Sequence, residues 1–176
     1  MTSKNLFMAV ILIFLMGSFT MAQDYEYIGA AKCKMCHNKP ATGEQYKIWS
    51  QSLHAKAFET LSNQKSMDYA KKNGIADPTK DAKCLKCHST AKSVSEDLVA
   101  TITVEEGVSC ESCHGPGSAY KAPNIMKDRA KAMAKGLIIP DKATCEKCHN
   151  KDNPFFKPFD YDAAVKKIAH PNPAAH

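Results

Sequence analysis

The stretch "GVSCESCHGPGSAY" covers residues 107–120 and contains two cysteines three positions apart, followed directly by a histidine. This CxxCH pattern occurs four times in the chain and accounts for all eight cysteines. With seven histidines among 176 residues, four chance occurrences would have a probability on the order of one in a million. The four copies are Cys33, Cys36 and His37; Cys84, Cys87 and His88; Cys110, Cys113 and His114; and Cys145, Cys148 and His149.

The CxxCH pattern is typical of covalent attachment of c-type haem. Two thiols one helical turn apart can add to the two vinyl groups of a porphyrin, and the adjacent histidine can then ligate the iron. Paired CxxC units also build zinc sites, but zinc does not need a histidine directly after each second cysteine. A disulfide framework would show varied spacings instead of four identical ones. We therefore predict four covalently bound haem c groups, each with its motif histidine as proximal ligand.

The amino terminus has the pattern of an export signal. Lys4 precedes an uncharged apolar run over residues 6–22, which ends in the small-x-small sequence Thr20-Met21-Ala22. We predict a signal peptide at residues 1–22 and one tetrahaem cytochrome domain at residues 23–176. An uncleaved membrane anchor is the alternative, because a run of 17 residues is near the lower limit for spanning a bilayer. The expected location is the periplasm, or else the cell surface or exterior.

The net charge of +6 does not predict nucleic-acid binding. Haem propionates would offset much of this charge, and most lysines then form a solvated surface or docking patches for redox partners. We expect exported redox proteins as electron donor and acceptor.

Residues 43–61, "GEQYKIWSQSLHAKAFETL", predict a helix that carries His54 beside its apolar face. Four of the seven histidines belong to the motifs, so His54 is a candidate ligand for the opposite side of a haem. Only three histidines are left for four haems, so at least one haem lacks a second histidine from its own chain. The last of the three, His176, ends a Pro/Ala tail that we expect to fray.

Three further segments have local patterns. Residues 97–108 alternate in polarity and predict a short strand or hairpin. Residues 124–136 predict a helix that ends at Gly136. A helix is also expected after Asp160, carrying His170 before Pro171 ends it.

The chain resembles the tetrahaem cytochrome c-554 family over essentially all of residues 23–176. The resemblance rests on "KCKMCH", "WSQSLHAKAFETL", "CLKCH", "GVSCESCHGPGS" and a final "CEKCH" followed by a carboxy-terminal histidine. It implies a mostly α-helical monomer that wraps closely stacked haems and acts in periplasmic electron transfer. It also implies that three haems have two histidine ligands and that the second haem is five-coordinate.

By this resemblance, His54 corresponds to the distal ligand of the third haem and His170 to that of the fourth. The family's distal histidine for the first haem follows the Gly-Pro-Gly turn, but residues 118–126 of this chain contain no histidine. Met126 is the nearest substitute, and a thioether ligand would raise the potential of that haem. Ordinary helix packing is the alternative role for Met126.

The predicted fold is therefore mainly α, a small multihaem cytochrome c fold of helices and loops around four stacked haems, with a minor short β-hairpin. The predicted function is electron transfer between redox partners, without a substrate of the protein's own. Two alternatives stay open. One is reduction or binding of a small nitrogen oxide, such as nitric oxide, at an open haem. The other is a subunit of an extracellular haem filament, in which His176 supplies a ligand to a neighbouring copy.

Overall fold

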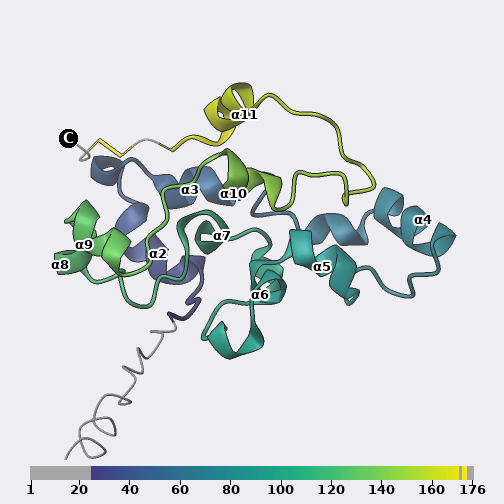
Figure 1. Cartoon of the computed structure of the whole chain (residues 1–176), viewed down its shortest axis with the longest axis horizontal. Coiled ribbons are helices and arrows are strands. Elements are labelled where there is room, and N and C mark those ends of the chain that lie inside the picture. The colour runs from purple at the N-terminus through teal and green to yellow at the C-terminus, as the bar shows by residue number, and fades with distance from the viewer. Residues whose placement is uncertain (1–24, 171, 174–176) are drawn as a thin grey trace, which may run out of the picture.

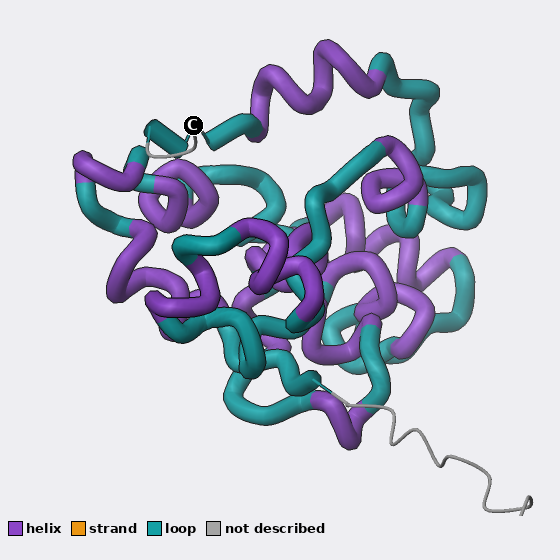
Figure 2. Tube along the Cα trace, turned by 60° about the vertical axis from the view of Figure 1, so that its left-hand side comes forward, coloured by secondary structure: helices purple, strands orange, loops and turns teal. Residues whose placement is uncertain are grey.

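The computed structural model describes residues 25–170 and 172–173, and this part of the chain is mainly helical. Figure 2 shows helices and loops along the whole described trace and no strand. The mainly α fold predicted from the sequence is confirmed. The predicted signal peptide at residues 1–22 and His176 lie outside the described residues.

The helices are short, and several begin at an aspartate or asparagine whose side chain accepts a backbone N–H of the first turn. Asn63, Asp81, Asp128, Asp141 and Asp160 cap helices in this way. In chain order the helices are α2 (Ala30–His37), η1 (Pro40–Thr42), α3 (Gln45–Ser50), η2 (Glu59–Ser62), α4 (Gln64–Lys72), α5 (Ala82–His88), α6 (Thr90–Ser93), η3 (Glu96–Leu98), η4 (Val104–Glu106), α7 (Cys110–His114), α8 (Pro123–Met126), α9 (Arg129–Ala134), α10 (Lys142–Glu146) and α11 (Tyr161–Ile168).

The helices form an elongated assembly instead of a layered one (Figure 1). Helices α2, α8 and α9 gather at one end, α4 and α5 lie at the other, and α7 lies between them. A long connection leads from α10 to α11 along one side of the molecule. The apolar core is small for a chain of this length, and its buried members are Ile28, Ala30, Leu61, Ala70, Leu85, Ala91, Ile102, Tyr120 and Ala132.

The hairpin expected over residues 97–108 does not form. This segment contains η3 and η4 and an isolated parallel bridge between Tyr27 and Val99. The Tyr27 N–H donates to the Leu98 carbonyl at 2.8 Å, and the Ala100 N–H donates to the Tyr27 carbonyl at 3.0 Å. The extended residues therefore pair with the chain just before α2 instead of with each other.

The single helix expected over residues 43–61 is also interrupted. Helix α3 ends at Ser50, and turns follow until η2. The His54 carbonyl accepts the N–H groups of Ala57, at 3.1 Å, and of Val108, at 3.0 Å, in place of a helical partner four residues on. A tertiary contact thus replaces the local helix, as is common for short helices of weak intrinsic stability.

Two other predicted helices have different bounds from those expected. Residues 124–136 form α8 and α9 separately, because the Asp128 side chain accepts the Lys131 N–H and starts a new helix. Helix α11 begins after Asp160 as predicted, but it ends at Ile168. His170 therefore follows the helix, which agrees with the restricted backbone of a residue that precedes proline.

Candidate haem-binding sites

The four CxxCH motifs lie on four separate helices or their ends. Helices α2, α5 and α7 end at the motif histidines His37, His88 and His114. In the fourth motif α10 ends at Glu146, and His149 lies in the following turn, with its N–H donating to the Cys145 carbonyl at 2.9 Å.

All eight cysteines are unpaired. Among the described residues, no group of three or more His, Cys, Asp or Glu side chains is placed to hold a metal ion directly. Zinc sites need four such ligands around one point. The donor set therefore fits separate porphyrin attachment sites, each with two thiols and one imidazole, better than zinc or a disulfide framework.

Three motif histidines have their Nδ1 atom held by a hydrogen bond. His37 Nδ1–H is placed to donate to Gln45 Oε1 at 3.3 Å. His88 Nδ1–H is placed to donate to the Ala57 carbonyl at 2.7 Å, and His114 Nδ1–H to the Ile138 carbonyl at 3.2 Å. A hydrogen bond at Nδ1 fixes the tautomer and leaves Nε2 to ligate a metal. These partners orient the imidazoles for iron.

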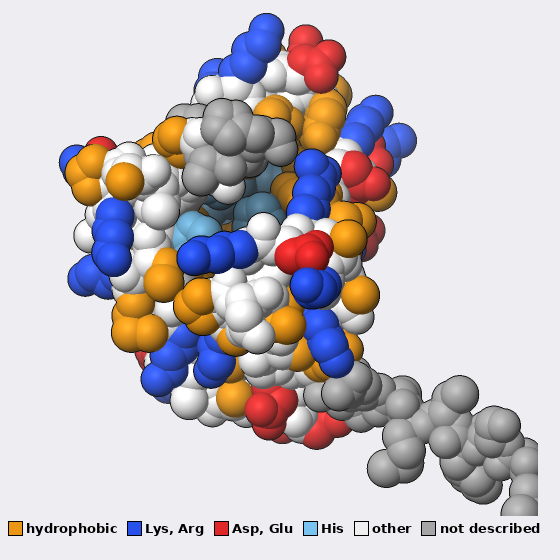
Figure 3. All heavy atoms as spheres, turned by 90° about the vertical axis from the view of Figure 1, so that its left-hand side faces the viewer, with side chains coloured by type: hydrophobic (Ala, Val, Ile, Leu, Met, Phe, Trp, Pro, Cys, Tyr) orange, Lys and Arg blue, Asp and Glu red, His pale blue; other side chains and the backbone are white. Residues whose placement is uncertain are grey.

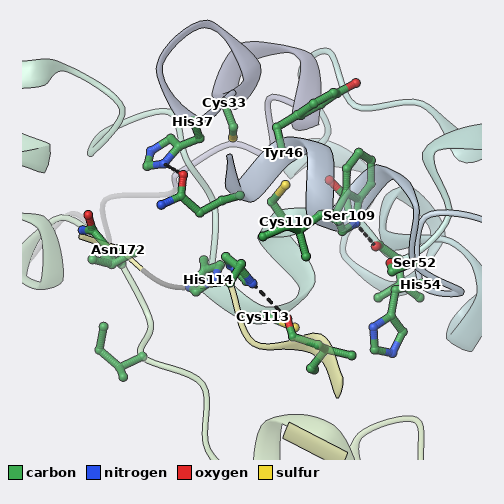
Figure 4. A pocket seen from close by; sticks show the side chains of 18 of the residues that line it. Cys33, His37, Tyr46, Ser52, His54, Ser109, Cys110, Cys113, His114 and Asn172 are labelled. Carbon is green, nitrogen blue, oxygen red and sulfur yellow. Dashed lines mark hydrogen bonds between the residues drawn. The ribbon is translucent and has the colours of Figure 1, made fainter. Parts of the chain in front are cut away.

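The first and third motifs share one cavity of about 500 Å³, within the roughly 300–1,000 Å³ range of cofactor pockets. Figure 4 shows His37 and Cys33 on one side of the cavity, Cys110 and Cys113 near its centre, and His54 on the far side. Tyr46, Trp49 and Ile139 add apolar lining. Such a wall suits the faces of a porphyrin.

Two pairs of histidine rings lie close together in an edge-on arrangement, at about the separation of two imidazoles that share one metal. The His54 and His149 ring centroids are 6.1 Å apart, and those of His114 and His170 are 5.8 Å apart. Two imidazoles that share one metal through bonds of about 2.0–2.1 Å have their centroids roughly 6 Å apart. His170 Nδ1 is also placed to donate to the Ile168 carbonyl at 3.1 Å, which leaves its Nε2 for the metal.

This pairing is the reverse of the one implied by the family resemblance. His54 faces the histidine of the fourth motif instead of the third, and His170 faces that of the third instead of the fourth. Met126 lines the cavity that also contains His37.

The environment favours the neutral form of His54 and of His114. Burial lowers the pKa of His54, and the neighbouring His149 ring lowers it further. Burial also lowers the pKa of His114, with smaller contributions in the same direction from His170 and His37, while a hydrogen bond to Ile138 opposes them. A neutral imidazole has a free lone pair on one nitrogen, as metal ligation needs.

Interactions between the cysteines of different motifs indicate the spatial order of the motifs. The Cys33 thiol of the first motif lies within hydrogen-bonding reach of Cys110 of the third, which lowers the pKa of Cys33. Cys113 of the third motif neighbours Cys145 of the fourth. Burial and a contact with Cys87 of the second motif raise the pKa of Cys148, in the fourth, to about 11. The order in space is thus first, third, fourth, second.

A buried carboxylate joins the first and third motifs. Glu111, inside the third CxxCH sequence, is 1% exposed. Its oxygens accept the N–H groups of Ile28 (3.0 and 3.1 Å), Gly29 (2.7 Å) and Gly117 (2.6 Å). Nearby, Glu106 accepts the Ala30 N–H at 2.8 Å. Neither role was predicted from the sequence, although an acidic residue between two haem-attaching cysteines is a signal that could have indicated one of them.

The glycines of the Gly-Pro-Gly turn allow close packing within the chain itself. Gly115 has φ +75°, and a Cβ there would lie 2.5 Å from the Gly136 carbonyl oxygen. A Cβ at Gly117 would lie 3.0 Å from Glu111 Oε1. The turn therefore makes room for the protein's own backbone and for the Glu111 carboxylate.

One face of the molecule is hollowed. Figure 3 shows histidine side chains within a hollow on this face and Lys or Arg side chains beside the hollow. Within the described residues, no helix has the length and apolar character needed to cross a membrane.

A small helical fold with CxxCH helices and opposed imidazoles defines the class of c-type cytochromes, which bind haem covalently and transfer electrons. The model of the family described as cytochrome c554 and c-prime matches residues 32–115. Cytochrome c-554 of Nitrosomonas europaea is 28% identical over 157 residues, which cover 80% of this chain and 65% of that protein. Both findings support a cytochrome of the c-554 type.

Two further comparisons add little. The yeast DnaJ protein homolog XDJ1 (Saccharomyces cerevisiae) is 35% identical over 68 residues, but these cover 39% of this chain and 12% of that protein. No solved structure matches the chain. The chain spans 65% of the length of the Nitrosomonas protein.

Proposed function

We propose that the exported protein holds four haem c groups in a row and relays electrons between two redox partners in the periplasm. The two opposed imidazole pairs carry this proposal, because their separations of 5.8 and 6.1 Å suit an iron with two histidine ligands. Each bound haem supplies an iron that changes between the ferric and ferrous states.

Interactions between the cysteines of different motifs support a continuous row. Cys33 and Cys110, and Cys87 and Cys148, lie within hydrogen-bonding reach, and Cys145 is near enough to raise the pKa of Cys113. The first and second motifs are then the two ends of the row. These ends are the natural places for the electron donor and acceptor to dock.

The chain's own residues hold the sites rigid. Imidazoles fixed at Nδ1 keep one geometry in both redox states, which limits the reorganisation that accompanies transfer. The carboxylate of Glu111 fixes α7 to the residues that precede α2, and so fixes the third motif relative to the first.

The proposal is tested by counting haems and following their reduction. We expect a pyridine haemochrome assay and the intact mass of protein secreted into the periplasm to give four haems and a chain that starts near Gln23. Cys110→Ala with Cys113→Ala should remove one haem. Stopped-flow mixing with a small exported cytochrome should then show rapid exchange in wild type and slower exchange between the row's ends in the variant. A count below four in wild type would contradict the proposal.

A second candidate function is binding of a small nitrogen oxide at the second site. Among the described residues no second histidine ring faces His88, whose Nδ1 is hydrogen-bonded to Ala57 and lies 3.2 Å from the Thr60 hydroxyl. A high-spin ferric signal from one haem, which disappears on addition of nitric oxide, would favour this function. Four low-spin signals would exclude it.

A further inference from the structure

The first site lacks an obvious partner for its proximal histidine. Among the described residues, the histidines outside the motifs are His54 and His170, and both rings face other motif histidines. Within the described part of the chain, the hydrogen-bond partner at His37 Nδ1 is Gln45, on the side away from a metal. The ligand opposite His37 is therefore of another residue type, if the described chain supplies it.

The cavity that contains His37 offers few such donors. Met126 and Lys167 line it, together with Tyr120. The Tyr120 hydroxyl donates to the His114 carbonyl at 3.1 Å and the Gly115 carbonyl at 2.8 Å, so it is already in use. A lysine ammonium has no lone pair until it loses a proton. The thioether of Met126 can ligate iron without any change of protonation.

The fold holds Met126 at the cavity wall. Met126 is the last residue of α8 and is half-buried. The cap of α9 at Asp128 ends α8 there. Beyond α9, the Ile138 N–H donates to the His114 carbonyl at 2.9 Å, and the Ile138 carbonyl faces His114 Nδ1. The segment that carries Met126 is thus tied at its far end to the third motif, which lines the same cavity.

We infer that Met126 Sδ is the second axial ligand of the haem attached through Cys33 and Cys36. This inference rests on the proposed function. A thioether favours ferrous iron more than an imidazole does, so the first site would have the highest potential of the four. Because the first motif lies at one end of the row, electrons would collect at that end, and it would deliver them to the acceptor.

The inference is tested on the fully matured protein with all haems in place. Oxidised wild type should show the long-wavelength charge-transfer band of thioether-ligated ferric haem, and a redox titration should show one potential above the others. Met126→Ala should lose the band and the high potential. Met133→Ala is the matched control, since Met133 is 49% exposed on α9 and should leave both unchanged. Met126→His should replace the band by a further low-spin bis-imidazole signal.

The outcomes separate this inference from the function beneath it. Four haems without the charge-transfer band in wild type would overturn the assignment of Met126 and leave the electron-transfer proposal intact. A band that persists in Met126→Ala, or that disappears in Met133→Ala, would also overturn it. Fewer than four haems in wild type would instead overturn the proposed function. If Met126→Ala does not mature, the wild-type spectrum and Met126→His still decide the question.

Discussion

The junction between the first and third motifs and the carboxy-terminal part of the chain are built in different ways. At the junction, Ile28, Ala30, Ser109 and Glu111 are buried, and backbone N–H groups converge on carboxylates. Of residues 140–170, 172 and 173, none is buried. One region is held by a polar network inside a small core, and the other lies on the surface.

The carboxy-terminal part contacts the body of the molecule through aromatic rings, several of them candidate ligands. Phe155 packs against Tyr69 of α4 at a ring-centroid separation of 5.3 Å. His149 packs against Phe159, at a ring-centroid separation of 5.2 Å, and faces His54, while His170 faces His114. Contacts within the polypeptide therefore define the first–third junction. The fourth site depends instead on two imidazoles, His54 and His149, that a haem iron would join. Substitutions at the junction should therefore lower the stability of the protein strongly, even where no haem ligand is changed. Substitutions in the surface part should lower it only slightly.

The largest effect is expected at Glu111. Glu111→Gln keeps the shape but places an amide NH₂ among backbone N–H donors, so at least one buried donor loses its partner. Loss of such partners should lower the free energy of unfolding by about 3 kcal/mol or more. Denaturant titration of the matured protein measures this, with exposed Glu105→Gln as the control. Equal stability of the two variants would contradict a clamp at the junction.

A smaller effect is expected at Gly115, which has φ +75° and ψ 174°. Alanine is strained in this backbone region and would also place Cβ 2.5 Å from the Gly136 carbonyl oxygen, so Gly115→Ala should cost about 2 kcal/mol or more. Gly74 has φ +69° with open space where a Cβ would lie, and Gly74→Ala should cost about 1 kcal/mol. Thermal unfolding of both variants compares backbone strain with and without the steric contact. Equal losses of stability in the two variants would mean that the short contact between Cβ and the Gly136 carbonyl adds no cost.

The same contrast explains what the sequence could predict. The mainly α fold followed from the CxxCH spacing together with the family resemblance, because three of the attachment pairs lie on helices that end at their histidine. Asp160 gave one helix start correctly. Local signals of this kind depend on neighbouring residues and can be recognised without tertiary information.

Long-range contacts decided the features that were predicted wrongly. Residues 97–108 pair with Tyr27, and the His54 carbonyl accepts a hydrogen bond from Val108, 54 positions away in sequence. No periodicity indicates such partners. The role of Glu111 was missed for the same reason. The acceptors at Ala57 and Ile138 were also missed, because both are backbone carbonyls, which any residue type could supply.

The smallest effect is expected at Asp141 on the exposed side of the comparison. The Thr144 N–H, and then the Thr144 hydroxyl, hold the pKa of Asp141 below its usual value. A carboxyl with a lowered pKa in the folded state stabilises the fold above its ordinary pKa, and this contribution is lost as the pH falls through the lowered value. Wild type should therefore lose part of the stability of α10 on acidification. Asp141→Asn can still cap the helix but does not titrate, so it should lose less.

The measurement is the denaturation midpoint of the matured protein as a function of pH below neutrality, compared between wild type and Asp141→Asn. Thr144→Ala removes the hydroxyl but keeps the backbone N–H donor, so its acid sensitivity should lie between the two. Because α10 has no buried residue, the difference should be slight beside that of Glu111→Gln. A large acid-dependent loss at Asp141 would mean that the fourth motif is held by its own polypeptide, as the first and third are, and would remove the distinction between the two regions.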